Sequence, residues 1–184
     1  AVVGPEYQFL FVDVGMNGRN SDGGNWSQSP MKKALENNTL NLPQPNSLII
    51  DSTRNIPYVC VGDDAFPLTT YMMKPFPQKD LTVDKRVFNY RLSRARRISE
   101  NALGILAARW RVFRKPFALS PEKVKIITYS ILILHTWLRS ESNFGKIYIP
   151  PNLIDYQDIS TDTIILGDWR NDVPKETWLD MEPS

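Results

Sequence analysis

The chain has 184 residues, 42% of them hydrophobic, with 22 Lys and Arg against 20 Asp and Glu. That length and composition suit one folded domain and exclude wholesale disorder. A single Cys and a single His exclude internal disulfides, thiolate zinc sites and imidazole-rich metal centres, so any chemistry must depend mainly on carboxylates.

The N-terminal part of the chain predicts a hairpin, a loop and a short helix. Residues 7–14 alternate and are rich in aromatic and β-branched side chains, which predicts a strand, and Val2–Val3 would end the strand before it. Four glycines in residues 15–24 predict a loop. A short helix is expected over residues 27–35, with a serine near its start and Pro30 in its first turn.

The middle of the chain predicts one buried strand and two long helices. The continuous apolar run 58–61 predicts a buried central strand. From Phe88 to Phe113 apolar residues recur with helical period, with a break expected at Gly104. Residues 120–122, Ser-Pro-Glu, predict the start of a further helix that runs to about Arg139 and is apolar enough to be buried.

No segment predicts a membrane span or a leader. The longest uncharged run that is mainly apolar, 126–138, has 13 residues and is too short to cross a bilayer. The first residues, Ala1-Val2-Val3, include neither Met nor a basic-then-apolar leader, which predicts an intracellular chain, with no membrane partner, entered partway along its sequence.

The charge is strongly segregated along the chain. Residues 85–115 contain ten Lys or Arg and one acid, Glu100, so this segment is +9 and the remainder is −7. Residues 141–184 carry nine acids and three basic residues. A solvated helix face is the ordinary explanation of such a run, but solvated helices usually interleave both signs. Density and arginine content therefore favour a phosphate-backbone partner, that is, a nucleic acid.

Glu100, the lone carboxylate in the basic helix, has two interpretations. It lies three and four positions after Arg97 and Arg96, so it can form an intrahelical salt bridge. It can also be a metal ligand that the helix presents toward the end of the strand at Asp63. The residues alone favour neither.

Other acids are candidates for the same metal site. Magnesium-dependent phosphodiester chemistry needs oxygen ligands that converge from separate elements. Asp63 ends the predicted central strand, and Asp22 lies in the glycine-rich loop. Asp64 would face the other way from Asp63, and Asp13 is interpreted as an ordinary strand-end charge.

Two reactive residue types are interpreted as structural. His135 lies alone in an apolar helix, which favours a hydrogen-bonded core histidine over a catalytic base. Cys60 lies in the predicted buried strand and is expected to act as a small hydrophobic residue.

Five ordered blocks of the sequence resemble one family, the DDE endonuclease domain of PIF/Harbinger transposases and the nucleases derived from Harbinger transposases. The blocks are 12–15, 18–24, 61–68, 88–97 and 100–106, with Leu134-His135 following in order. The resemblance covers about residues 1–139 and makes residues 140–184 an acidic C-terminal tail.

This resemblance implies an α/β, RNase H-like fold with a mixed central sheet, flanking helices and no first strand. It implies metal-dependent hydrolysis of DNA phosphodiester bonds that leaves a 3′-hydroxyl. It also implies a nuclear location that leaves room for a cytoplasmic pool, and leaves open a separate DNA-binding partner protein.

Carried onto this sequence, the family's catalytic, metal-binding carboxylates fall on Asp22, Asp63 and Glu100, with Mg²⁺ or Mn²⁺ as the cofactor. The phosphate backbone would be held by Arg91, Arg94, Arg96 and Arg97.

One family position has no counterpart in this sequence. The family's first carboxylate, in an Ile/Val-Asp-Gly-like motif on an earlier strand, has no match before Asp22. Either the chain starts after it or the copy is degenerate. We therefore expect the 184-residue chain to be a poor nuclease by itself, and a catalytically inactive DNA- or protein-binding remnant of a transposase is the alternative.

Overall fold

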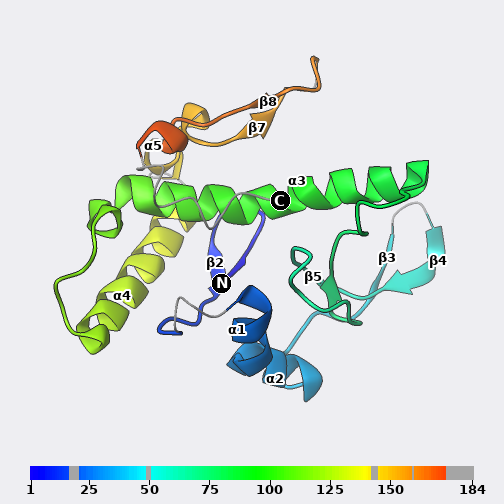
Figure 1. Ribbon diagram of the computed structural model, residues 1–184, viewed down its shortest axis with the longest axis horizontal. Helices are drawn as coiled ribbons and strands as arrows, with labels where there is room; N and C mark the ends of the chain where they lie inside the picture. The colour runs from blue at the N-terminus through cyan, green and yellow to red at the C-terminus, as the bar shows by residue number, and fades with distance from the viewer. Residues whose placement is uncertain (17–20, 49–50, 142–144, 159, 173–184) are drawn as a thin grey trace. The chain divides into compact units, whose positions relative to one another are not determined.

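The computed structural model describes residues 1–16, 21–48, 51–141, 145–158 and 160–172 and is a mixed α/β structure rich in helix (Figure 1). Parts of the predicted loop 15–24 and of the predicted tail lie outside the described residues. The chain divides into two compact units. Unit 1 comprises Ala1–Gly15 and Arg97–Ser184, and unit 2 comprises Met16–Arg96.

Unit 1 begins with the predicted hairpin. Strand β1 (Val2–Val3) pairs antiparallel with β2 (Phe9–Phe11). The Gly4 amide donates to the Gln8 carbonyl at 2.9 Å, and Tyr7 closes the turn with a positive φ of 64°. The expected strand over 7–14 is therefore confirmed in position, although its paired part is shorter.

The long basic helix is α3 (Val83–Arg109), which starts five residues before the expected position and is continuous through Gly104. Gly104 serves packing rather than a break. A Cβ atom there would lie 2.3 Å from the Trp169 ring, so only glycine lets the indole lie against the helix backbone. A 3₁₀ turn, η1 (Arg111–Arg114), follows the helix.

The second long helix, α4 (Pro121–Ser140), begins at the predicted proline, but the prediction that it is buried is wrong. Only Ile131, Leu132 and His135 are buried, whereas Ile133 and Trp137 are 68% and 53% exposed. In the described part of unit 1, one face of α4 meets β2 and α3, and its other apolar side chains stay exposed.

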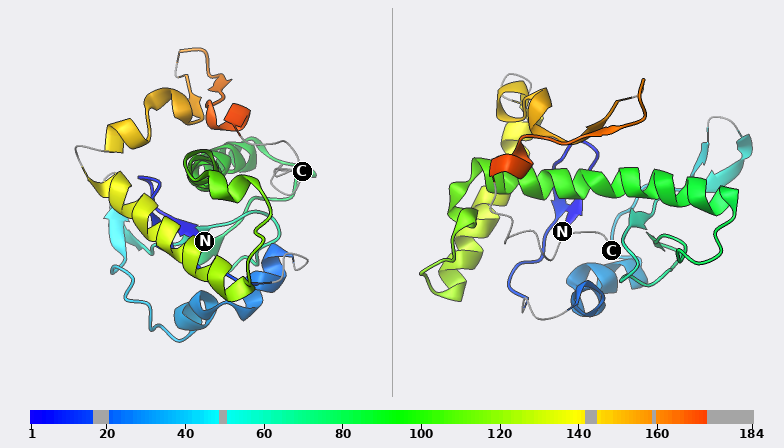
Figure 2. Two further views of the ribbon diagram at one scale, coloured as in Figure 1. Left: turned by 90° about the vertical axis from the view of Figure 1, so that its left-hand side faces the viewer. Right: turned by 45° about the horizontal axis from the view of Figure 1, so that its top comes forward.

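The remaining elements of unit 1 come from the segment predicted as a tail. They are α5 (Gly145–Tyr148), η2 (Pro151–Leu153), the antiparallel pair β7 (Tyr156–Gln157) and β8 (Ile164–Ile165), and α6 (Trp169–Asp172). The left view of Figure 2, down α3, shows this segment on one side of the helix and α4 on the other. The predicted domain boundary at residue 139 stays a prediction, but part of the acidic segment is folded against α3.

Two apolar clusters hold α3 within unit 1. The first cluster contains Phe9, Ala102, Leu106, Ile131 and Leu132. The second contains Ile105, Ala108, Ile149, Leu153 and Trp169. The second cluster depends on residues beyond α4, so residues 145–172 contribute core side chains.

Unit 2 contains two short helices, α1 (Asp22–Gln28) and α2 (Pro30–Glu36), before its strands. The expectation of a loop through residue 24 is wrong at its end, because the Ser21 hydroxyl accepts the Gly24 amide and starts α1. Ser29 caps α2 in the same way, with Pro30 in the first turn as predicted.

The strands of unit 2 are β3 (Asn46–Leu48), β4 (Asp51–Ile56), β5 (Cys60–Val61) and β6 (Met72–Met73). Strand β5 confirms the predicted strand and pairs in parallel with β6. The prediction that it is buried is wrong, because Cys60 is half-buried and Val61 is exposed.

The expected mixed central sheet is not formed among the described residues, whose strands pair into four two-stranded sheets. Each of these strands has only two to six residues and one pairing neighbour, so no sheet has a central strand. In the part of the chain that the structure describes, no helix is both long enough and apolar enough to span a membrane.

Candidate functional site

Asp63 lies two residues after the end of β5, and two groups of unit 2 contact its carboxylate. One oxygen, Oδ1, accepts the Ala65 amide hydrogen at 3.0 Å, which closes a turn after the strand. The other, Oδ2, lies 3.9 Å from Nη2 of Arg96 on α3, and the two side chains are 29% and 24% exposed. Oδ2 therefore faces a cation within a partly exposed side chain.

Asp22 is the first residue of α1 and is exposed. The start of α1 packs against the turn that follows Asp63. A Cβ atom on Gly23 would lie 2.6 Å from the Ala65 carbonyl oxygen, and the rings of Trp26 and Phe66 meet edge to face with centroids 5.8 Å apart. Unit 2 thus brings the segments that carry Asp22 and Asp63 into contact.

Glu100 lies on α3 in unit 1 and is half-buried. Among the described residues it forms no ion pair with Arg96 or Arg97, so the intrahelical salt bridge allowed by the sequence is not formed. Arg96 faces Asp63 instead.

The donor chemistry of these three side chains fits a hard divalent cation, because carboxylate oxygens are the ligands that Mg²⁺ and Mn²⁺ prefer. Among the residues described, no group of three or more His, Cys, Asp or Glu side chains is close enough to hold a metal ion. The assignment of Asp22, Asp63 and Glu100 as a metal site stays a prediction.

The four arginines predicted to contact DNA have different surroundings. Arg91 and Arg94 are exposed, and the Arg94 guanidinium lies 6.0 Å from the centre of the Tyr90 ring. Arg96 and Arg97 are half-buried. Exposed guanidinium groups suit phosphate contacts, so Arg91 and Arg94 fit the predicted role most directly.

Some of the basic residues that follow have structural contacts instead. Arg114 donates from Nη2 to the Ala108 carbonyl at 3.0 Å and so caps the C-terminal end of α3. Arg109 donates from Nε to the Tyr148 carbonyl at 2.8 Å. Counting charge along the sequence could not separate these roles from DNA binding.

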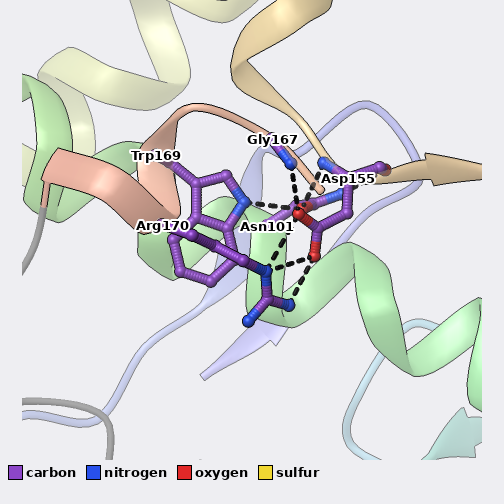
Figure 3. Close-up of polar contacts among 5 residues, drawn as sticks. All are labelled: Asn101, Asp155, Gly167, Trp169 and Arg170. Atoms are coloured by element: carbon purple, nitrogen blue, oxygen red, sulfur yellow. Dashed lines mark hydrogen bonds and ion pairs between the residues drawn. The ribbon is translucent and has the colours of Figure 1, made fainter. Parts of the chain in front are cut away.

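A buried polar cluster beside Glu100 was not predicted (Figure 3). Asn101, 2% exposed, accepts the Asp155 amide and the Trp169 Nε1 hydrogen at its Oδ1, each at 3.0 Å, and donates from Nδ2 to the Asp155 carbonyl at 3.0 Å. The Asp155 carboxylate accepts the Gly167 amide at 2.7 Å and the Arg170 Nε hydrogen at 3.0 Å. The only sequence signal was an asparagine within an apolar helical stretch.

His135 belongs to a second buried chain of hydrogen bonds. The Tyr7 carbonyl can only accept, so His135 Nε2 carries the ring hydrogen and donates to that carbonyl at 2.9 Å. Nδ1 of the neutral ring then accepts the hydrogen of the Tyr148 hydroxyl, 2.8 Å away, and this hydroxyl accepts the Trp110 indole hydrogen at 2.9 Å. The predicted core histidine is confirmed.

The titration behaviour of this chain follows from burial. Burial lowers the pKa of His135, against the opposing effect of its hydrogen bond to the Tyr7 carbonyl. Burial also raises the pKa of Tyr148 to about 12, so its hydroxyl stays protonated and able to donate. Every polar atom of the imidazole is used internally, which makes His135 structural.

Comparison with known proteins agrees with the blocks found in the sequence. Residues 1–136 match the family described as DDE superfamily endonuclease. The chain is also similar to "Protein ALP1-like" from Arabidopsis thaliana, with 32% identity over 116 residues, which is 61% of this chain and 27% of that protein. No solved structure matches the chain. The resemblance to a DDE endonuclease domain is thereby confirmed, while the RNase H-like fold stays a prediction.

Proposed function

Because the chain belongs to the DDE superfamily endonucleases, we propose that it is part of the catalytic domain of a metal-dependent, transposase-derived enzyme that hydrolyses DNA phosphodiester bonds. The observation that carries this proposal is the family match over residues 1–136, which includes all three predicted carboxylates. The match covers 27% of the length of "Protein ALP1-like", and we propose this activity for the matched domain alone.

In this proposal Asp63 and Glu100 hold the divalent cation, Mg²⁺ or Mn²⁺, and Asp22 assists. The partly exposed carboxylate of Asp63 and the contact between its turn and the start of α1 support a shared role for Asp63 and Asp22. Bound divalent cations supply Lewis acidity to the scissile phosphate and lower the pKa of an attacking water. The RNase H-like fold is proposed with the family assignment, as the scaffold on which these carboxylates converge.

The DNA backbone is proposed to lie along the basic stretch of α3. Arg91 and Arg94 contact phosphates from exposed positions, while positive charge is added by Arg96, 3.9 Å from Asp63, and by Arg97, three residues before Glu100. Phosphate contacts hold the scissile bond in register without reading base sequence. A nuclear location and a separate protein that supplies target specificity are consistent with this sequence-independent mode of binding.

Metal binding tests the proposed carboxylates without requiring turnover. The purified chain is titrated with Mn²⁺, followed by electron paramagnetic resonance, beside Asp22→Asn, Asp63→Asn and Glu100→Gln. Loss of a ligand should weaken Mn²⁺ binding by about tenfold or more, since even outer-shell changes cost about 10- to 100-fold. Asp13→Asn is the matched control and should bind as the parent chain does. Equal affinity in all variants would contradict the site.

DNA binding and nicking separate the nuclease from its inactive alternative. If four arginines neutralise phosphates, the plot of log K against log salt for duplex DNA should have a slope of about −3 to −4. A flat salt response would contradict a DNA partner.

Nicking of supercoiled plasmid with Mn²⁺ is expected to be weak, and any nicking should disappear in Asp63→Asn. A chain that binds DNA but shows neither Mn²⁺ binding nor nicking would support the catalytically inactive remnant instead.

A further inference from the structure

We infer that residues 145–172, beyond the region matched to the family, position Glu100 by bracing α3, with Asn101 as the positioning residue. This inference rests on the proposed role of Glu100 as a metal ligand. It assigns a working role to a segment that the sequence presents only as an acidic tail.

In unit 1, two faces of α3 are packed against other elements. Successive helical residues are turned by about 100°, which places Ala102 and Leu106 about 110° around the helix from the face formed by Asn101, Ile105 and Ala108. The first pair packs in the cluster with β2 and α4, and Ile105 and Ala108 pack in the cluster with residues 145–172. Glu100 lies on the remaining side of the helix, about 105° from the Asn101 face and about 140° from the Ala102 face. The left view of Figure 2 shows the two packing partners on different sides of the helix.

Asn101 joins residues 145–172, the brace, to α3 through hydrogen bonds that need both an amide oxygen and an amide nitrogen. Its Oδ1 accepts two hydrogens, from the Asp155 amide and the Trp169 indole, while its Nδ2 donates to the Asp155 carbonyl. An aspartate would place a carboxylate oxygen against that carbonyl, and a leucine would remove all three of these hydrogen bonds. Because these groups are buried, each lost bond has a large cost.

The braced segment is itself internally fixed. The Asp155 carboxylate, 1% exposed, binds the Gly167 amide and the Arg170 guanidinium, which closes the chain from η2 to α6 (Figure 3). Trp169 lies directly on the backbone of α3 at Gly104. A rigid segment seated on bare helix backbone resists rotation of that helix about its own axis.

Rotation of α3 is the motion that matters for Glu100. A side-chain end about 5–6 Å from the helix axis moves about 2 Å when the helix rolls by about 20°. A misplacement of about 1 Å in a reacting constellation can cost about 100-fold in rate. Packing against one face of α3 alone would permit such a rotation, whereas packing against two faces prevents it.

The test compares variants that lose stability by different routes. Asn101→Leu removes the bonds between α3 and residues 145–172, and Leu35→Ala removes buried apolar packing on α2, in unit 2, without changing either of the clusters that hold α3. The unfolding temperature of each variant is measured first, and Mn²⁺ affinity is then measured at a temperature well below it. We expect both variants to be destabilised, Asn101→Leu to bind Mn²⁺ about tenfold more weakly, and Leu35→Ala to bind within about twofold of the parent chain.

A milder variant keeps the inference testable if Asn101→Leu does not fold. Trp169→Phe removes one donor to Asn101 and should weaken Mn²⁺ binding by a smaller factor in the same direction. Unchanged Mn²⁺ affinity in the folded Asn101 or Trp169 variant, with weakened affinity in Glu100→Gln, would overturn the brace and leave the proposed function standing. Unchanged affinity in Glu100→Gln would overturn both.

Discussion

Removal of one hydroxyl, in Tyr148→Phe, should destabilise the chain far more than its size suggests. The hydroxyl accepts from the Trp110 indole at 2.9 Å and donates to His135 Nδ1 at 2.8 Å. The phenylalanine ring would keep the edge contact with His135, whose ring centroid lies 5.3 Å away. The substitution therefore removes hydrogen bonds while it preserves packing.

The expected cost follows from the two groups left without partners. His135 is fully buried and cannot switch its ring hydrogen to Nδ1, because Nε2 needs it for the Tyr7 carbonyl. A buried polar group without a partner costs about 1–3 kcal/mol, and Trp110 is only half-buried, so we expect a loss of about 2–4 kcal/mol in the free energy of unfolding. For a chain of this size, a loss of about 3 kcal/mol lowers the unfolding temperature by about 6–12 °C.

Urea unfolding at pH 7.5, followed by circular dichroism, measures this loss. Tyr156→Phe is the matched control, because Tyr156 lies in the same segment with an exposed ring and should change stability by less than about 0.5 kcal/mol. A loss below about 1 kcal/mol for Tyr148→Phe would refute the tautomer and the relay of hydrogen bonds from Trp110 to Tyr7.

Three further outcomes follow from other contacts. The pKa of His135 is lower in the folded chain than in the unfolded chain, so the unfolded chain takes up a proton at His135 at a higher pH than the folded chain does. The urea midpoint should therefore fall as the pH drops below about 6.5. A midpoint that rises would contradict a neutral His135. Gly23→Ala should cost about 1–3 kcal/mol in urea unfolding, since its Cβ would lie 2.6 Å from the Ala65 carbonyl oxygen, and a neutral result would refute that close approach. Arg96→Ala should raise Mn²⁺ affinity by about two- to fivefold, because it removes a competing cation near Asp63. Arg86→Ala is the control and should leave Mn²⁺ affinity unchanged. Weaker Mn²⁺ binding by Arg96→Ala would show instead that Arg96 supports the site.

Local chemistry predicted the parts of the fold whose causes lie within a few residues. Pro121 after a serine predicted the start of α4, and the serine caps with Pro30 predicted α2. The hairpin of β1 and β2 followed from residue alternation and a glycine turn. Helix caps and hairpin turns depend on neighbours in sequence, so they can be inferred from sequence.

Burial was predicted less well, because it depends on which partner covers a face. An apolar composition made α4 look buried, but Ile133 and Trp137 stay exposed in the described structure. The sequence presented residues 140–184 only as an acidic tail, yet Asp155 is buried and paired with Arg170. Composition records how much apolar or charged surface a segment has and not what lies against it.

The sequence by itself determined the family, the carboxylates at Asp22, Asp63 and Glu100 as candidate ligands, and the concentration of positive charge on α3. Only the tertiary structure decided that Arg96 faces Asp63 and that Asn101 bonds to Asp155 and Trp169, which lie 54 and 68 positions away. A motif is a short run of neighbouring residues and can be read from the sequence. A buried hydrogen-bond network forms only once distant segments have packed and water has been excluded from between them.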